Sequence, residues 1–373
     1  MAKEHIKVYI QTPSWFIRPR NTDWRYTRFN IPRLSNFIPE CEFHLSRSRA
    51  VALDANARYL KGILRHRLHI PFKPDAASHL DRQEFLCSGC DLVYCHDSFP
   101  GNADSIPIVW QNSILDPEMK RARGDSEEDI GRESATKKLC FAMAARVQVS
   151  TEAECVRLSR WFPELADKFV AVPFFLPDVR PIAEDDASKK FAPKDGLRCL
   201  FVGHEARRKG LARVYAAFSC LPPRIQRRLH LTVVSAQTDG KIEAPSLPNL
   251  RVCGALPSPR VQDLLRESDV LLMPSFFESY GIIFLEAMSQ AAIPVVPDWE
   301  VQREIVDYGA AGIVTSGDPL EIARKLEELL DDGNLRIALA TNARKRFETS
   351  YAPEVVAEKF RSLFHRAARP HQA

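Results

Sequence analysis

Residues 274–288 read Pro274-Ser275-Phe276-Phe277-Glu278-Ser279-Tyr280-Gly281-Ile282-Ile283-Phe284-Leu285-Glu286-Ala287-Met288. The residues just before them, 269–273, form an almost wholly apolar run of strand length. From Gly281 to Ala292 the residues are apolar nearly all the way round a helix, and Pro294 follows. Such a helix is expected to be buried. The order strand, loop and helix directs the helix N-terminus toward whatever lies beyond the carboxyl end of the strand.

Glu286 is unexpected in a helix of this kind. A buried carboxylate costs on the order of several kcal/mol unless a partner satisfies it. One interpretation is a salt bridge to a neighbouring Arg or Lys, because buried charges are usually paired. Glu278, on the loop that leads into the same helix, favours another interpretation. Two carboxylates that flank a glycine at a helix start predict a binding site.

A second cluster lies between Leu200 and Leu211, where a strand, Gly203 and the run His204-Glu205-Ala206-Arg207-Arg208-Lys209 lead into a helix. Cations at a helix start oppose the macrodipole, which favours anions there. A solvated basic run is one interpretation; a bound anion is the other. Backbone N–H groups together with Lys or Arg suit a phosphate. With the Gly281 helix start and the two carboxylates, the predicted ligand carries a diphosphate and hydroxyl groups, as a sugar nucleotide does.

Strands and helices alternate along both halves of the chain, which predicts an α/β fold with parallel sheets covered on both faces. In the second half we expect strands at 197–202, 229–235, 250–253, 269–273 and 293–296, and helices near 209–220, 259–267, 281–292, 318–330, 333–348 and 353–367. In the first half we expect strands at 7–12, 91–95, 106–110, 146–150 and 169–175, and a helix that begins at Glu152.

Two other segments are expected to be irregular. Residues 118–138 carry many charges of both signs, and we interpret them as a mobile loop that leads into a helix. Residues 176–196 contain three prolines and an acidic run, which is typical of an interdomain linker. Two α/β domains on either side of this linker would form a cleft at the carboxyl ends of their strands.

Composition limits the class of protein. The chain has 373 residues, 45% of them hydrophobic and 27% charged, which fits two globular domains. No apolar run approaches the length of about 20 residues that spans a membrane. The N-terminus lacks a secretory apolar segment, so we expect a cytoplasmic protein. Nine cysteines are scattered, and Cys87 and Cys90 form the one close pair; reduced thiols are favoured over a metal site.

Positive charge is concentrated near the N-terminus. Over residues 1–80 there are 14 Lys and Arg against 6 Asp and Glu. Residues 53–68 place apolar side chains at helical spacing with cations between them, which is typical of a helix that packs on a core or lies on a membrane surface. A peripheral contact with the inner membrane face is therefore one expectation. No nucleic-acid-binding motif accompanies these charges, so nucleic acid is not an expected partner.

The motifs resemble the donor site of glycosyltransferase family 4, which comprises retaining enzymes of the GT-B fold. The similarity runs from about Val149 to Phe347 and includes Gly203, Lys209-Gly210, Pro274-Ser275, Glu278 to Gly281 and Glu286-Ala-Met. It implies two Rossmann-like, doubly wound parallel-sheet domains that face each other across a cleft. Their expected bounds are 1–178 for an acceptor-binding domain, on which helix 353–367 packs back, 179–196 for a linker and 197–352 for a donor-binding domain.

The resemblance also implies roles for single residues. Lys209 would bind the donor diphosphate, Glu286 the ribose hydroxyls and Glu278 the transferred sugar. The donor-binding set is Gly203, His204, Arg208, Lys209, Glu278, Tyr280, Gly281, Ile282 and Glu286, with backbone amides contributed by residues 280–282. His204 stands where the family has an Arg, so that Arg207 or Arg208 would supply the second cation.

The catalytic set implied by the resemblance is Lys209, Glu278 and His96. His96 follows a middle strand and would face the reacting sugar, although a structural histidine is the alternative. The expected reaction is transfer of a sugar, with retention of configuration, from a nucleoside-diphosphate sugar to an acceptor hydroxyl. Cell-surface polysaccharide, lipopolysaccharide or glycolipid synthesis is the expected setting, with no metal and no cofactor. The alternatives are a sugar-nucleotide epimerase or hydrolase of the same fold, and a non-catalytic glycan- or nucleotide-binding subunit.

Overall fold

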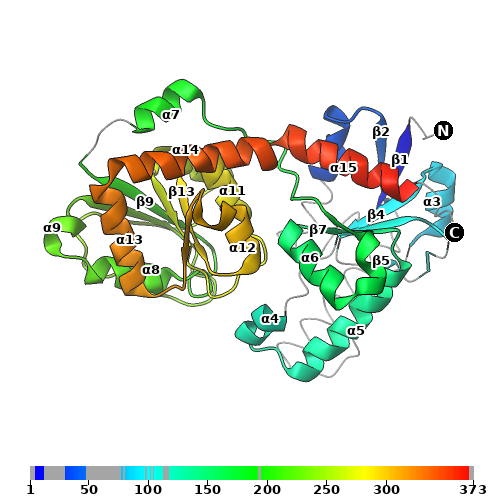
Figure 1. Ribbon diagram of the computed structural model, residues 1–373, viewed down its shortest axis with the longest axis horizontal. Coiled ribbons are helices and arrows are strands. Elements are labelled where there is room, and N and C mark those ends of the chain that lie inside the picture. The colour runs from blue at the N-terminus through cyan, green and yellow to red at the C-terminus, as the bar shows by residue number, and fades with distance from the viewer. Residues whose placement is uncertain are drawn as a thin grey trace. The chain divides into compact units, whose positions relative to one another are not determined.

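The computed structural model describes residues 5–11, 30–47, 77–78, 80–96, 99–100, 102–103, 105–111, 117–191 and 195–368. The chain divides into two compact units (Figure 1). Unit 1 comprises Met1–Pro117, Asp125–Pro177 and Pro353–Ala373, and unit 2 comprises Glu118–Gly124 and Asp178–Ala352. The C-terminal helix thus belongs to the same unit as the N-terminal half of the chain.

Unit 2 contains a six-stranded sheet in the order β11-β10-β9-β12-β13-β14, with every neighbouring pair parallel. Its strands are β9 (Leu197–Val202), β10 (Leu229–Val234), β11 (Leu250–Cys253), β12 (Val270–Leu272), β13 (Ile293–Pro297) and β14 (Ile313–Thr315). The central strands are apolar on both faces, as expected for a parallel sheet that is covered on both sides.

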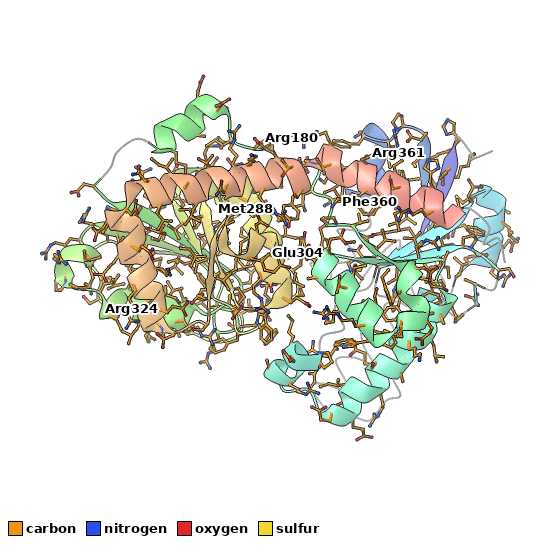
Figure 2. All side chains as sticks on the ribbon, viewed as in Figure 1. Arg180, Met288, Glu304, Arg324, Phe360 and Arg361 are labelled. Carbon is orange, nitrogen blue, oxygen red and sulfur yellow. The ribbon has the colours of Figure 1, made fainter. Side chains whose placement is uncertain are left out.

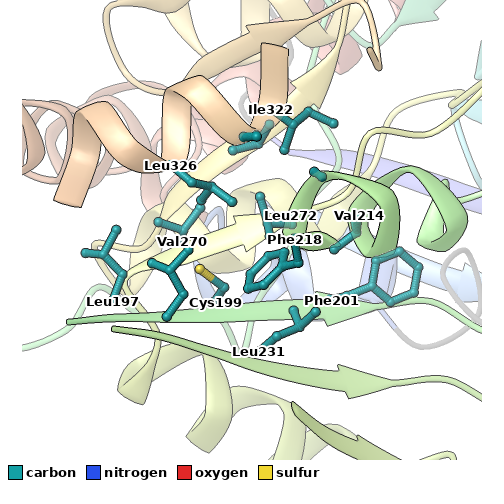
Figure 3. Close-up of a cluster of buried hydrophobic side chains, with 14 of the residues drawn as sticks. Leu197, Cys199, Phe201, Val214, Phe218, Leu231, Val270, Leu272, Ile322 and Leu326 are labelled. Atoms are coloured by element: carbon teal, nitrogen blue, oxygen red, sulfur yellow. The ribbon is translucent and has the colours of Figure 1, made fainter. Parts of the chain in front are cut away.

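The helices of unit 2 cover both faces of this sheet. They are α7 (Glu184–Phe191), α8 (Leu211–Cys220), α9 (Pro223–Gln226), α10 (Ser258–Glu267), α11 (Ile282–Ser289), α12 (Glu300–Ile305), α13 (Pro319–Asp331) and α14 (Gly333–Ser350), with the 3-10 turn η4 (Asp307–Gly309). The helices α8 and α13 share one core with β9, β10 and β12 (Figure 3). The helices α11 and α14 contact each other and β13. Most of α4 (Pro117–Arg123) is also assigned to this unit.

Unit 1 contains a second six-stranded parallel sheet, in the order β2-β1-β4-β6-β7-β8. Its strands are β1 (Ile6–Gln11), β2 (Cys41–Leu45), β4 (Leu92–His96), β6 (Ile108–Gln111), β7 (Arg146–Val149) and β8 (Phe169–Ala171), and β3 (Ala77–Ser78) pairs separately with β5 (Phe99–Pro100). The helices are η2 (Ile31–Asn36), α3 (Arg82–Ser88), α5 (Glu127–Met143), α6 (Glu152–Trp161), η3 (Pro163–Lys168) and α15 (Pro353–Ala368).

Side chains alternate between the two faces of the unit 1 sheet. Val8 and Ile10 belong to the core beneath α15, whereas Tyr9 belongs to the core beneath α3, α5 and α6. Helix α15 buries Phe360 against β4, where the ring meets Tyr94 edge-on, and Arg361 of the same helix pairs with Glu40 (Figure 2). The predicted α/β class with two doubly wound parallel sheets is confirmed.

Three local expectations were wrong. Residues 118–138 are not a mobile loop, because they form most of α4 and α5. Ser126 caps α5 by accepting from the Asp129 N–H, and three acids occupy the first turn, where the helix dipole favours them. The strand expected at 169–175 ends at Ala171, and the segment expected as a linker contains α7, which Ile182 and Ala187 anchor to Ala291. The expected basic helix at 53–68 lies outside the described residues.

Each sheet has a switch point, where successive strands turn from one side to the other. In unit 2 the chain runs from β9 outward to β11 and then returns beside β9 with β12. In unit 1 the corresponding neighbours are β1 and β4. Ligands of doubly wound sheets bind beyond the carboxyl ends of the strands at this position. The loops that follow β9 and β12 are therefore expected to form the ligand site of unit 2.

Candidate functional site

Both clusters singled out from the sequence flank the switch point of unit 2. The basic turn, defined as residues 204–210, follows β9, and the acidic loop, defined as residues 273–281, follows β12. Since β9 and β12 are parallel neighbours, their carboxyl ends meet at one edge of the sheet. The fold therefore brings together two segments that lie about 70 residues apart in the sequence.

The basic turn precedes a helix and does not belong to it. Residues 206–210 form turns, and α8 begins at Leu211 rather than near residue 209. The Lys209 N–H donates to the Glu205 carbonyl at 2.9 Å, and the Lys209 side chain lies over Gly203. Glu205 also accepts from Nε and Nη2 of Arg208, at 2.8 and 2.6 Å. The backbone and one carboxylate thus hold the cations in a defined conformation.

The two segments are joined by hydrogen bonds in both directions. The Phe276 N–H donates to the Arg208 carbonyl at 2.9 Å, and Arg208 Nη1 donates to the Phe277 carbonyl at 3.0 Å. Gly210, at φ 85°, lets the turn approach Pro274 so closely that a Cβ would lie 2.2 Å from the proline carbonyl oxygen. Any side chain at position 210 would separate the basic turn from the acidic loop.

Glu278 connects the two charged clusters. Its carboxylate is buried, with 5% of the residue exposed, and it forms an ion pair with Lys209. Arg208 Nη1 lies 3.7 Å from the same carboxylate oxygen. Arg207, by contrast, packs its guanidinium against Gly240, and His204 is exposed with its carbonyl accepting from Thr238. Of the two arginines considered for a second cation, Arg208 is therefore the one beside Lys209 and Glu278.

The N-terminus of α11 presents free backbone donors at this place. Gly281 caps the helix with φ 87°, and a Cβ there would lie 2.4 Å from the Phe284 ring, so the position requires glycine. Among the described residues, the N–H groups of Ser279, Gly281, Ile282 and Ile283 have no hydrogen-bond partner. Unpaired N–H groups and the positive end of the helix dipole favour an anion here.

Glu286 lies one turn after Ile282 on the same side of α11. Both side chains are half-buried, whereas Phe284, Leu285, Ala287 and Met288 are buried, so the helix is not covered all round. No Lys or Arg in the described part of the chain forms an ion pair with Glu286, which argues against the salt-bridge interpretation. Burial raises the pKa of its carboxyl to about 7, although a hydrogen bond from Gln262 opposes the shift.

Two segments that sequence reasoning did not connect with the site hold it in place. Both carboxylate oxygens of Asp239, on the loop after β10, accept from the N–H groups of Arg207 and Arg208, at 3.1 and 2.9 Å. Gln302 of α12 and Trp299, the N-cap residue of that helix, donate to carbonyls of the acidic loop. The Thr238-Asp239-Gly240 run after a strand is a turn signal that could have identified the first support. No comparable sequence signal marks Gln302.

His96 belongs to unit 1, where it is the last residue of β4, beside the switch point of that sheet. Its ring lies edge-on to Phe174, with the ring centroids 6.2 Å apart. A catalytic role for His96 stays a prediction.

A separate cavity of about 570 Å³ opens at the opposite edge of the unit 2 sheet. Arg198 and His230, near the starts of β9 and β10, line it together with Lys190 and Arg266. There Lys190 Nζ donates a hydrogen bond to the Gln290 carbonyl at 2.6 Å. None of the predicted site residues lines this cavity.

Within the described residues, no group of three or more His, Cys, Asp or Glu side chains could hold a metal ion. All nine cysteines are free thiols, and Cys87 and Cys90 form no disulfide. No helix in the described ranges has the length and apolar character needed to span a bilayer.

Comparison with known proteins places the second half of the chain in a family. Residues 183–346 match the family model for glycosyl transferases group 1. A D-inositol 3-phosphate glycosyltransferase from Thermobispora bispora is 27% identical over 209 residues, which cover 51% of this chain and 49% of the relative. A phosphatidyl-myo-inositol mannosyltransferase from Mycolicibacterium smegmatis is 29% identical over 160 residues, or 41% of each chain. The matched part spans about half the length of these relatives or less.

Solved structures share the complete fold. Anabaena HepE in complex with UDP-glucose superimposes with a TM-score of 0.58 at 15% identity, covering 96% of this chain and 100% of that one. WaaG, a glycosyltransferase involved in lipopolysaccharide biosynthesis, gives 0.55 at 16% identity over 95% and 98% of the two chains. At these identities the likeness concerns the fold, which is GT-B.

Proposed function

Since the chain belongs to the group 1 glycosyl transferases and has the GT-B fold, we propose that it transfers a sugar from a nucleoside-diphosphate sugar to an acceptor hydroxyl with retention of anomeric configuration. One observation supports this most directly. At the switch point of unit 2, Lys209 and Arg208 meet Glu278 and the unpaired N–H groups of α11. Cations and N–H groups suit a diphosphate, and the carboxylates suit the hydroxyls on either side of it.

In this proposal the donor diphosphate lies between Lys209 and the N-terminus of α11. Glu286 accepts from the ribose hydroxyls, and Glu278 exchanges part of its contact with Lys209 for hydroxyls of the sugar. The structure of HepE with UDP-glucose is consistent with such a ligand in the same fold. The carboxylates bind hydroxyls here and do not attack the sugar.

The bond between the anomeric carbon and the diphosphate oxygen breaks with its electron pair on the oxygen. The acceptor oxygen bonds to the anomeric carbon from the same face, and its proton passes to the departing diphosphate. Lys209, Arg208 and the N–H groups of α11 stabilise the negative charge on that leaving group. One donor placed in this way is worth about 3–4 kcal/mol in the transition state. Because protein cations and amides supply this charge, we expect turnover without a divalent cation; loss of turnover in EDTA and its return with Mg²⁺ would contradict this part.

The proposed acceptors are precursors of cell-surface polysaccharide, lipopolysaccharide or glycolipid. A capsular polysaccharide biosynthesis glycosyltransferase of Staphylococcus aureus is 23% identical over 172 residues, which supports the class without identifying the acceptor. The excess of cations over residues 1–80 supports a peripheral contact with anionic lipid at the inner membrane face. Reversing the charges of Arg58, Lys61 and Arg65 should then release the protein from anionic liposomes, and unchanged binding would contradict the contact.

The deciding experiment has two steps. A thermal-shift screen against nucleoside-diphosphate sugars should identify the donor, because a ligand that binds the folded state alone raises its stability. Release of nucleoside diphosphate is then measured over a panel of acceptors, and the anomeric configuration of the product is read by NMR. Free epimerised sugar nucleotide without glycoside would indicate the epimerase alternative. Donor binding without any turnover would indicate a non-catalytic subunit.

A further inference from the structure

Gln302 of α12 contacts the acidic loop. Figure 1 labels this helix, and Figure 2 labels Glu304 on it. Gln302 is fully buried. Its side-chain Nε2 donates to the carbonyl of Glu278 at 3.2 Å and to the carbonyl of Tyr280 at 2.9 Å. One side-chain amide thus holds two peptide units of the loop, the one between Glu278 and Ser279 and the one between Tyr280 and Gly281.

The direction of these carbonyls fixes the direction of the neighbouring N–H groups. In a planar trans peptide the C=O and the N–H point to opposite sides. No cis peptide bond occurs in the described part of the chain. The carbonyl of Glu278 shares its peptide unit with the Ser279 N–H, and the carbonyl of Tyr280 shares one with the Gly281 N–H. Turning both carbonyls toward Gln302 therefore turns both N–H groups away from it.

Those two N–H groups are among the unpaired donors of the site. Neither the Ser279 N–H nor the Gly281 N–H has a hydrogen-bond partner within the described ranges. They lie on either side of Tyr280, between the Glu278 carboxylate and the first turn of α11. Without Gln302, rotation of either peptide unit would move an N–H out of this direction and bring a carbonyl oxygen toward the place proposed for the diphosphate.

The hydrogen bonds that the Gln302 side chain makes within the described residues all go to the acidic loop. Its Oε1 is buried and accepts no hydrogen bond from any described group. A buried acceptor without a partner is destabilising, although an apolar side chain that avoided this cost would leave the carbonyls of Glu278 and Tyr280 without their donor. Trp299, the N-cap residue of α12, donates from Nε1 to the Phe276 carbonyl at 3.2 Å, so α12 and its N-cap contact the acidic loop at three carbonyls in all.

We propose that Gln302 is a positioning residue of the donor site: its Nε2 orients the peptide units after Glu278 and Tyr280 so that the N–H groups of Ser279 and Gly281 bind the diphosphate. This inference rests on the proposed donor site. Gln302 touches no ligand itself and acts through the backbone of the acidic loop. It also adds the Ser279 N–H to the donor-binding groups expected at residues 280–282.

The test compares two glutamines whose side chains make the same kind of hydrogen bond, although Gln302 is fully buried and Gln226 is half-buried. Gln226 of α9 also donates its Nε2 to two backbone carbonyls, those of Phe218 and Leu221 at 3.1 and 2.9 Å, but it lies away from the site. Gln302→Met and Gln226→Met each remove two such bonds while keeping the length of the side chain. The Kd of UDP and of GDP is measured for both variants by calorimetry and Tm by scanning calorimetry, and kcat and KM follow with the donor identified by the screen.

We expect Gln302→Met to weaken binding of the preferred nucleoside diphosphate about tenfold and to lower kcat by a further factor of about 10. Gln226→Met should lower Tm while leaving Kd within twofold of the wild-type value. If Gln302→Met also leaves Kd within twofold, Gln302 is structural and the proposal is overturned. If the wild-type protein binds neither nucleotide nor any donor in the screen, the proposed function itself fails, which is a distinguishable result.

Gln302→Glu provides the second variant should the methionine variant not fold. The glutamate keeps the shape of the side chain, but its ionised form cannot donate to either carbonyl, whereas its protonated form can donate to one. The ratio of variant Kd to wild-type Kd should therefore rise with pH. A ratio that does not change with pH would overturn the positioning role.

Discussion

Glu286 combines a half-buried carboxyl with the lack of an ion pair in the described part of the chain, and burial raises its pKa from 4.5 to about 7. A raised pKa means that the fold favours the protonated acid. Below about pH 4.5 the carboxyl is protonated in both the folded and the unfolded state, so it causes no penalty. As pH rises from 4.5 to 7 the unfolded chain ionises first, and the free energy of unfolding falls. Above pH 7 the loss is complete.

Glu286→Gln should therefore stabilise the protein at pH 8 and leave its stability unchanged at pH 4.5. The gain has an upper limit of about 3 kcal/mol, from 1.36 kcal/mol per pKa unit, and solvent contact reduces it. Chemical denaturation at the two pH values measures the difference. Glu267→Gln, the same change at an exposed position of unit 2, controls for the loss of one negative charge. Equal stability of the Glu286 variant and wild type at pH 8 would contradict the pKa shift.

The same substitution should weaken donor binding. Only the ionised carboxylate accepts hydrogen bonds at both oxygens, so the affinity of the wild-type protein for UDP or GDP should fall as pH drops below 7. Glu286→Gln should bind about tenfold more weakly at pH 8 and lose this part of the pH dependence. Calorimetric titrations between pH 5.5 and 8 would reveal it. If the variant were more stable than the wild type and bound the nucleotide equally tightly, Glu286 would not be part of the donor site.

The Lys209–Glu278 pair is the other feature at the scale of single residues. Both side chains are largely buried, at 15% and 6% exposed, so that removing either partner leaves a charge with poor solvation. Lys209→Met and Glu278→Gln should each destabilise the ligand-free protein, by about 2–3 kcal/mol given that Arg208 remains near the carboxylate. The double variant should recover much of that loss, because no charge is left unpaired.

Activity should not recover in the double variant. Lys209→Met should lower kcat at least about 100-fold, as expected for a donor that stabilises leaving-group charge, and adding Glu278→Gln should lower it further. A double-mutant cycle of unfolding free energies, run beside kcat measurements, separates the two effects. If the stabilities of the two single variants simply added in the double variant, the ion pair would contribute nothing to the fold.

At the scale of elements, the basic turn depends on the loop after β10. Asp239 accepts two backbone N–H groups of the turn with both carboxylate oxygens. Asp239→Ala should cost about 1–3 kcal/mol of stability and raise the KM for the donor severalfold, because the cations lose their defined position. Asp318 offers a matched control, since it accepts the N–H groups of Leu320 and Glu321 at the start of α13, at 2.8 and 2.9 Å. Asp318→Ala should lower Tm without changing KM. A similar change of KM in both variants would mean that Asp239 stabilises the fold and has no specific effect on the donor site.

Elements with a strong periodic pattern were predictable from the sequence, and elements that depend on long-range contacts were not. The strand at 197–202 was predicted at its observed bounds, because a parallel strand covered on both faces appears as an apolar run. The strand at 250–253 was also predicted at its observed bounds, although it lies at the edge of the sheet and its two central residues are exposed. Helix α4 was missed, because its charges resemble those of a loop. Helix α12 is only six residues long and has no side-chain N-cap hydrogen bond, so no local signal marks it.

Only the charged residues of the candidate site were predictable from the sequence. Glu278, Lys209 and Glu286 stand out because each charged group occurs where a neutral or apolar residue would be more stable, and such local conflicts often mark function. Gln302 and Asp239 were not found, because their importance comes from hydrogen bonds to backbone groups 22 to 32 residues away. A sequence pattern shows which side chains are present, but it does not show in which direction the backbone C=O and N–H groups point.

At the scale of the whole molecule, the chain contains separate hydrophobic cores in the two units. Phe360 of α15 is fully buried in a core of unit 1, although α15 is the last helix of the chain, and Phe218 of α8 is buried in a core of unit 2. Truncation of a buried phenylalanine typically costs about 3–5 kcal/mol. We expect Phe360→Ala to lower the melting temperature of unit 1 and Phe218→Ala that of unit 2.

Scanning calorimetry should then show two separate unfolding transitions, since each variant lowers the transition temperature of one unit below that of the other. A nucleoside diphosphate that binds in unit 2 should raise the transition temperature of unit 2, which is the one that Phe218→Ala lowers. It should leave the transition temperature of unit 1, which Phe360→Ala lowers, unchanged, because a ligand stabilises only the part of the chain that binds it. If both variants lowered a single transition equally, and the nucleotide raised that transition in both, the two units would unfold as one. Stability of the donor site would then depend on α15 as well, and truncating Phe360 should weaken nucleotide binding as much as truncating Phe218.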